Sequence, residues 1–192
     1  MAPDPIPHDP NPPLRDQRIL LCVCGGIAAY KAADLVRRLQ DAGAQVRVAM
    51  TENATRFVGT ATFQALSGHP VRTSLWDDAA ELAMGHIELA RWAQRIVIAP
   101  ATADMIAKLA HGFADDLIST LCLASEAPVT VAPAMNHRMW GHPATQTNVA
   151  TLRSRGVNFL GPAEGRMAEP ESGPGRLLEP HEIVAALAGA PA

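Results

Sequence analysis

Residues 18–50 read RILLCVCGGIAAYKAADLVRRLQDAGAQVRVAM, and this stretch decides the fold class. The apolar run Arg18–Val23 is typical of a strand that is buried on both faces. A tight turn at Cys24–Gly26 follows, and Ile27–Asp41 then carries apolar and charged residues at helical spacing. Another apolar run, Gln45–Met50, predicts a second strand. Strand, helix and strand at this spacing predict a βαβ unit, and therefore a parallel sheet with a right-handed crossover.

The same alternation continues along the chain. Further strands are expected at Arg95–Ala99, Pro128–Ala132 and Val157–Leu160, and further helices at Thr102–Ala110, Asp116–Ser125, Pro143–Arg155 and His181–Leu187. The sequence therefore predicts a single doubly wound, Rossmann-like α/β domain over residues 17–190. Within it, residues 161–180 are rich in Gly, Pro and Glu, and we expect an irregular, flexible flap there that covers a substrate.

Composition and charge exclude several classes of protein. Of the 192 residues, 48% are hydrophobic and 18% are charged, which is the balance of a globular chain. The net charge of -3 gives no basic surface for nucleic acid, and no run approaches the roughly 20 apolar residues that span a membrane. Residues 1–16 contain six prolines and no apolar signal-peptide core, so we expect a disordered N-terminal segment and a cytoplasmic protein.

The cysteines and histidines show no pattern of a metal site. Cys22, Cys24 and Cys122 each lie in an apolar run, and their odd number favours buried free thiols over a disulfide. Neither these cysteines nor the seven histidines have the spacing of zinc ligands, so we expect no metal.

Three predicted strands end in loops of small or polar residues, at Cys24–Gly26, Ala99–Thr102 and Ala132–Asn136. Thr51, just after another strand, belongs to the same edge. Ligands of open α/β sheets bind at the carboxyl ends of the strands, so we expect these loops to converge on one crevice.

The Gly25-Gly26 turn opens a predicted helix, whose free N–H groups and positive dipole end suit a phosphate. The turn matches neither the G-x-G-x-x-G fingerprint nor a P-loop, and a single such loop fits a mononucleotide better than a dinucleotide. The alternative is that the two glycines only permit a tight turn between strand and helix.

His86 and Asn136 are the two side chains with a candidate chemical role. His86 follows Gly85 at the start of a predicted helix, where a neutral imidazole can accept a proton, although a capping or surface histidine has the same pattern. Asn136 follows a strand, and its amide can hold a carboxylate in a dry pocket or serve only as a helix cap. Met135 and Met139 would pack around it.

Several motifs in the right order cover nearly all of residues 18–180. They are CGGIAAYKAADLVRRL, TENATRFV, TFQALSGHPV, MGHIELARWA, APATADMIAKLAHGFADDL, PAMNHRMW and GPGRLLEP. Together they resemble the homo-oligomeric flavin-containing cysteine decarboxylase family, and most of all its bacterial phosphopantothenoylcysteine decarboxylase branch.

The resemblance implies FMN bound between the subunits of a homotrimer, which assembles further into a dodecamer in some members. It implies contacts with the flavin from Gly25, Gly26, Ile27, Thr51, Phe57, Ala101, Thr102, Ala103 and Asp104, the last of which stands where the family often has Asn. His86 falls on the catalytic histidine and Asn136 on the residue that binds the substrate carboxylate. Met135, Met139 and Arg176 fall on the substrate side of the site.

The implied reaction is FMN-dependent decarboxylation of 4'-phosphopantothenoylcysteine to 4'-phosphopantetheine in coenzyme A biosynthesis, by way of a thioaldehyde and an enethiol. In this family the domain is often fused to the synthetase of the preceding step, so a phosphopantothenoylcysteine synthetase is a possible partner.

One departure from the family leaves two alternatives open. Many relatives have Ala-Cys-Gly in the flap, whereas this chain reads Ala168-Glu169-Pro170 and has no cysteine after Cys122. Either Glu169 or Glu171 returns the proton, or the enethiol is the product, as in the enzymes that decarboxylate a C-terminal peptide cysteine in lantibiotic-type maturation. A third alternative is a non-catalytic flavin-binding regulatory subunit, which the presence of both His86 and Asn136 disfavours.

Overall fold

The computed structural model describes residues 11–76, 85–166 and 172–189. Its main sheet contains the parallel strands β1 (Arg18–Val23), β2 (Gln45–Met50), β3 (Arg95–Ala101), β4 (Val129–Pro133) and β5 (Asn158–Phe159), in the order β2-β1-β3-β4-β5. The strand order reverses between β1 and β3, which is where doubly wound sheets bind their ligands. The predicted fold class is confirmed.

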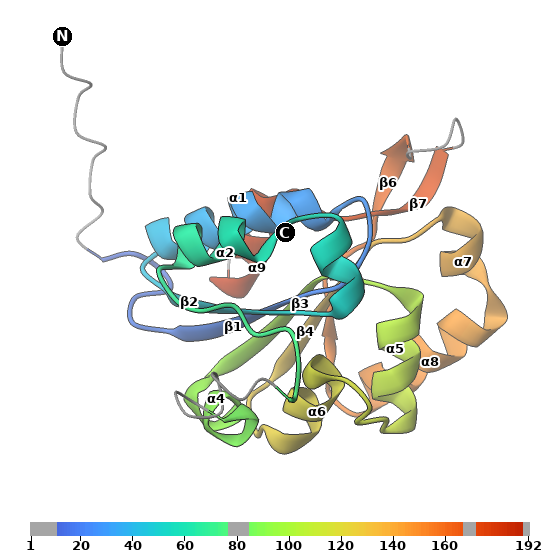
Figure 1. Cartoon of the computed structure of the whole chain (residues 1–192). Helices are drawn as coiled ribbons and strands as arrows, with labels where there is room; N and C mark the ends of the chain where they lie inside the picture. Colours follow the sequence, from blue (N-terminus) through green and yellow to red (C-terminus); the bar gives the residue numbers. More distant parts are fainter. Residues whose placement is uncertain (1–10, 77–84, 167–171, 190–192) are drawn as a thin grey trace, which may run out of the picture.

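Helices cover both faces of this sheet (Figure 1). They are α1 (Ala29–Asp41), α2 (Thr60–Ser67), α4 (His86–Trp92), α5 (Ala103–His111), α6 (Leu117–Ala124), α7 (His137–Gly141), α8 (Pro143–Ser154) and α9 (Pro180–Leu187), with a 3-10 helix, η1 (Glu52–Arg56). In Figure 1, α1, α2 and α9 lie above the sheet, and α4, α5, α6 and α8 lie below it. None of the helices in the described ranges is long and apolar enough to cross a membrane.

The strand β1 shows why a continuous apolar run predicts a strand that is buried on both faces. Ile19 and Leu21 belong to the core formed with α1 and α9, whereas Leu20 and Cys22 belong to the core formed with α4, α5 and α6. All four side chains are fully buried. Two apolar layers on one strand hold the sheet rigid, and this fixes the positions of the loops at its carboxyl edge.

The N-terminal segment differs from the prediction. Leu14 is fully buried in the core, its N–H donates to the Ala42 carbonyl at 2.8 Å, and the Asp16 N–H donates to the Gly43 carbonyl at 3.0 Å. The expected disorder is therefore wrong for residues 11–16, because one apolar side chain in a proline-rich run is enough to anchor it. Residues 1–10 lie outside the described ranges.

The flap also differs from the prediction. Residues Ala163–Arg166 (β6) and Ser172–Arg176 (β7) pair as an antiparallel hairpin instead of an irregular loop. The hairpin is attached to the body of the domain, because the Met135 N–H donates to the Gly175 carbonyl at 2.9 Å. Glycine weakens an isolated strand, but a Cβ on Gly173 would lie 3.1 Å from the His137 Cβ, so glycine at this position lets β7 approach the start of α7. Glu169 and Glu171 belong to residues 167–171, which lie outside the described ranges.

Candidate functional site

A cavity of about 670 Å³ lies where the loops after β1, β3 and β4 meet, which confirms the predicted crevice. It is lined by Gly25, Gly26, Ile27, Ala28, Tyr30, Lys31, Thr102, Ala103, Ala134, Met135, Asn136, Met139, Gly175, Arg176 and Leu177. Its volume is in the range of cavities that bind cofactors and drug-sized ligands. The walls are mostly apolar, and the polar groups among them come from four separate segments of chain.

The two glycines after β1 have different reasons to be glycine. A Cβ atom on Gly25 would lie 2.6 Å from the Asn53 Cβ and 2.8 Å from the Asn53 carbonyl carbon, so only glycine allows η1 to sit this close. A Cβ on Gly26 would meet nothing within 4 Å. The tight-turn interpretation therefore explains Gly25, whereas Gly26 leaves its backbone open to the cavity at the N-terminus of α1, where an anion is favoured.

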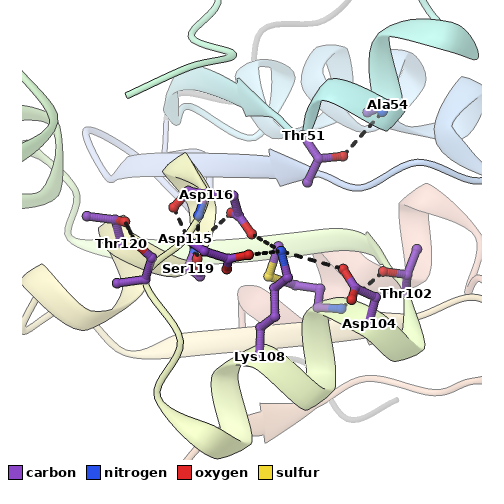
Figure 2. Close-up of polar contacts among 11 residues, drawn as sticks. Thr51, Ala54, Thr102, Asp104, Lys108, Asp115, Asp116, Ser119 and Thr120 are labelled. Carbon is purple, nitrogen blue, oxygen red and sulfur yellow. Dashed lines mark hydrogen bonds and ion pairs between the residues drawn. The ribbon is translucent and has the colours of Figure 1, made fainter. Parts of the chain in front are cut away.

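Two threonines at the carboxyl edge act as helix caps (Figure 2). The Thr102 hydroxyl accepts from the Met105 N–H at 3.2 Å, at the start of α5, and Thr102 also lines the cavity. The Thr51 hydroxyl accepts from the Ala54 N–H at 3.2 Å, at the start of η1, but Thr51 is not among the lining residues. Caps of this kind fix helix starts that border the site.

Beside the cavity, Lys108 of α5 gathers three carboxylates (Figure 2). Its ammonium lies 2.9 Å from Asp116, 3.0 Å from Asp115 and 3.9 Å from Asp104. The hydrogen bond with Asp116, the N-cap residue of α6, is the main reason why the pKa of Lys108 is raised. Asp104 is thus directed at Lys108 and does not line the cavity, and the cluster joins the start of α5 to the start of α6.

Replacing Lys108 by Met is expected to lower the free energy of unfolding by about 1–3 kcal/mol at pH 7, because three carboxylates then lose their common partner. The hydrogen bond from Lys108 lowers the pKa of Asp115 in the folded state. The part of the stabilisation that comes from Asp115 is therefore present above the ordinary carboxyl pKa and is lost as the pH falls through the folded value. Urea unfolding should therefore show a difference between variant and parent that shrinks below about pH 4. A difference that stays constant with pH would contradict this account.

Asn136 is a helix cap and also lines the cavity, so the two roles that the sequence left open are compatible. Its Oδ1 accepts from the Arg138 N–H at 2.8 Å, which makes it the N-cap of α7, and the residue also lines the cavity together with Met135 and Met139. Since the amide oxygen is the atom that caps the helix, its NH₂ group is the part that can donate a hydrogen bond to a carboxylate in the cavity.

His86 lies elsewhere. It is the first residue of α4, is half-buried, and is not among the residues that line the cavity. In Figure 1, α4 lies at the lower left, whereas α7 and β7 lie on the opposite side of the molecule. A single chain therefore does not bring His86 and Asn136 together. Phe57 and Ala101 are likewise absent from the lining, and Ala101 is fully buried in β3.

The three cysteines are free thiols, as predicted, and two of them are buried. Burial raises the pKa of Cys24 to about 12, although that residue directly precedes the Gly25-Gly26 turn. Burial also raises the pKa of Cys122 to about 12. Both groups stay protonated at neutral pH, so neither acts as a thiolate nucleophile or metal ligand.

Sequence reasoning missed several lining residues, above all Tyr30, Lys31 and Leu177. A signal existed for Lys31, since it follows Ile27 by four residues and therefore shares a face of the predicted helix with it. For Leu177 the sequence held no comparable signal, because its place depends on how β7 reaches the loop before α7.

The strand order and the cavity at the carboxyl edge place the chain in the doubly wound α/β class, whose members bind their ligands at this edge. Comparison with known proteins narrows this class. The chain belongs to the Flavoprotein family, whose family model matches residues 8–190.

Curated relatives include the coenzyme A biosynthesis bifunctional protein CoaBC of Vibrio vulnificus (strain YJ016), which is 56% identical over 172 residues. The protein of the same name from Escherichia coli (strain K12) is 56% identical over 171 residues. The alignments cover 90% and 89% of this chain but 43% and 42% of those relatives, so the chain spans less than half of their length.

Solved structures agree with this assignment. A PPC decarboxylase mutant complexed with pantothenoylaminoethenethiol matches with a TM-score of 0.78 and 31% identity, covering 90% of this chain and 97% of that one. The FMN-dependent cysteine decarboxylase SpaF matches with a TM-score of 0.74 and 32% identity, covering 92% of this chain and 99% of that one. The resemblance inferred from the sequence motifs is confirmed.

Proposed function

We propose that the chain is an FMN-dependent decarboxylase that converts 4'-phosphopantothenoylcysteine to 4'-phosphopantetheine in coenzyme A biosynthesis. The observation that carries the proposal is one cavity that combines the Gly26 end of α1 with the amide of Asn136. The 56% identity to bifunctional CoaBC proteins supports the same reaction. A synthetase, on the same or another chain, is the partner that would supply the substrate, and a cytoplasmic location stays a prediction.

The residues of the cavity fit FMN. The open backbone at Gly26 and the N-terminus of α1 suit its phosphate, and the apolar walls suit a flat ring. The described lining residues include two cations, Lys31 and Arg176, and no Asp or Glu, which suits an anionic ligand. When bound, the flavin supplies a two-electron oxidation of the substrate thiol that amino-acid side chains cannot perform.

The chain's own residues then hold and orient the substrate. The NH₂ group of Asn136 would donate to the substrate carboxylate, in an orientation that the hydrogen bond to Arg138 fixes. Met135 and Leu177 form part of the wall around it and keep water from the carboxylate. A carboxylate in an apolar site is poorly solvated, so its loss as carbon dioxide becomes easier.

We infer that His86 is the proton acceptor and that it acts in the cavity of a second copy of the chain. Its position outside the cavity of its own chain supports this assignment. Large apolar side chains are exposed at both places, with Ile27 67% and Tyr30 61% exposed at the cavity and Ile87 42% exposed beside His86. Contact between copies would cover them. A homotrimer, alone or within a dodecamer, is the proposed assembly.

The peptide-modifying alternative rests on one sequence feature. No cysteine follows Cys122, and neither Cys24 nor Cys122 is among the described residues that line the cavity. A chain that lacks a proton donor for the last step would release an unsaturated enethiol. SpaF, a cysteine decarboxylase, is as similar in identity to this chain as the PPC decarboxylase is.

Mass spectrometry of the product separates the alternatives. Flavin-loaded protein incubated with phosphopantothenoylcysteine is expected to give a product that has lost carbon dioxide only. A product that has also lost two hydrogen atoms would mean that the enethiol is released. No reaction with this substrate, but reaction with a cysteine-ended peptide, would overturn the coenzyme A assignment.

Gly25→Ala is expected to weaken FMN binding by about 10- to 100-fold. The added methyl group overlaps the Asn53 backbone, and relief of an overlap of this kind costs about 1–3 kcal/mol and displaces either η1 or the turn. Flavin fluorescence titration measures the dissociation constant. Gly59→Ala is the matched control, because a Cβ there meets nothing within 4 Å. Equal affinity in both variants would show that the contact with Asn53 does not shape the flavin site.

A further inference from the structure

Two positively charged side chains line the cavity. Lys31 projects from α1, and Arg176 projects from the end of β7. No acidic residue is among the described lining residues. The Gly26 end of α1 already offers one anion site, so these two cations add a second positive region to the same cavity.

One carboxylate holds the two cations together. The Lys31 ammonium lies 2.7 Å from Glu179 Oε1, and an Arg176 nitrogen lies 3.0 Å from the same oxygen. Two nitrogens that share one oxygen are close enough to contact a single phosphate. The hydrogen bond from Lys31 lowers the pKa of Glu179, so the carboxylate stays ionised at neutral pH. The three groups together keep one net positive charge.

The backbone of β6 sets the position of Arg176. A Cβ atom on Gly165 would lie 2.7 Å from one guanidinium nitrogen and 3.1 Å from the Arg176 Cδ, so the side chain lies across bare backbone. Gly165 also has a φ of +146°, which side chains rarely adopt. The guanidinium is therefore held from two sides, by Gly165 and by Glu179, which lowers the entropy lost when it binds a ligand.

We propose that Lys31 and Arg176, positioned by Glu179, bind the phosphate monoester of the substrate and so determine its specificity. This inference rests on the proposed function. A planar guanidinium and an ammonium carry more donors than Glu179 uses, and a phosphate dianion accepts from both. The Gly26 end of α1 is the proposed site of the FMN phosphate, which leaves Lys31 and Arg176 as the positive groups for the phosphate of the substrate.

The test compares phosphopantothenoylcysteine with its dephosphorylated form, pantothenoylcysteine. For Arg176→Gln, kcat/KM is expected to fall about 10- to 100-fold with the phosphorylated substrate and to change little with the other, because only the first loses a charge-assisted hydrogen bond. Arg176→Lys keeps the charge, so its kcat/KM with the phosphorylated substrate should lie between the values of the parent protein and Arg176→Gln. Arg37→Gln, an exposed arginine of α1 outside the cavity lining, controls for the loss of one positive charge.

Three results would overturn the inference. An equal loss with both substrates would mean that Arg176 contacts a group common to both. A weaker affinity for FMN, with riboflavin affinity and substrate preference unchanged, would assign the pair to the flavin phosphate. If Arg176→Gln keeps the preference of the parent protein for the phosphorylated substrate, Arg176 has no role in substrate specificity.

A binding measurement keeps this inference separate from the proposed function. Calorimetric titration of the flavin-loaded protein with phosphopantetheine and with pantetheine needs no turnover. A preference for the phosphorylated compound that Arg176→Gln abolishes supports the subsite, even if neither substrate reacts and the proposed reaction fails. Lack of any preference in the parent protein overturns the subsite, whether or not the protein is an active decarboxylase.

Discussion

Two inactive variants, His86→Asn and Asn136→Asp, are expected to regain activity when they assemble together. Each variant alone should lose decarboxylation, by about 10²–10⁴-fold for the loss of a general base. His86 does not line the cavity of its own chain, and under the proposed assembly it acts in the cavity of another copy. In a trimer that contains both variants, about a third of the sites combine an intact His86 with an intact Asn136.

Co-expression of the two variants with different affinity tags, followed by purification on both tags, isolates the mixed assemblies. Their turnover per bound flavin is compared with that of each variant alone and with the parent protein. The same double purification of two differently tagged His86→Asn chains is the control and should stay inactive. Absence of recovery in the mixed assembly, with flavin still bound, would mean that both residues act from one chain. Normal turnover of His86→Asn alone would remove its role as the base.

The sequence predicted the strands most accurately where a strand is a continuous apolar run that is buried on both faces. The bounds of β1 and β2 are those expected, because an apolar run covered on both faces has no other stable place in the domain. The predicted end of β3 at Ala99 is wrong by two residues. Pro100 cannot donate a hydrogen bond, but its carbonyl still accepts from the Cys24 N–H at 3.1 Å, and Ala101 pairs with Pro133.

The site was predictable only as far as the strand ends fix it. The loops that hold Gly26, Thr102 and Asn136 converge because parallel strands end at one edge. The contact between Lys31 and Glu179 joins residues 148 positions apart, so no local sequence pattern predicts it. The hairpin of β6 and β7 depends on pairing with glycine-rich backbone, which composition alone reads as irregular. The proposed role of His86 depends on contact between copies of the chain, and a single sequence does not reveal such a contact.

Asn136→Asp is the second variant with a large expected effect. Because aspartate can keep the helix cap, the substitution changes the hydrogen-bond donor without disturbing the fold. Aspartate is as good an N-cap as asparagine, so its carboxylate should still accept from the Arg138 N–H and α7 should keep its start. The NH₂ donor, however, is replaced by a second acceptor oxygen with a negative charge. Repulsion of the substrate carboxylate is then expected to reduce kcat/KM by at least about 10³-fold, with thermal stability and bound flavin unchanged.

Asn136→Ser separates the loss of the donor from the added charge. Serine also caps a helix but is neutral, so this variant should retain more activity than Asn136→Asp while both fold alike. Product formation by mass spectrometry and thermal unfolding of the two variants give the comparison. The pH adds a second check, because protonation of the new carboxyl below about pH 4 removes the repulsion and should narrow the gap between the variants. If Asn136→Asp turns over as fast as the parent protein, Asn136 is only a helix cap, and the substrate carboxylate must be held by another group.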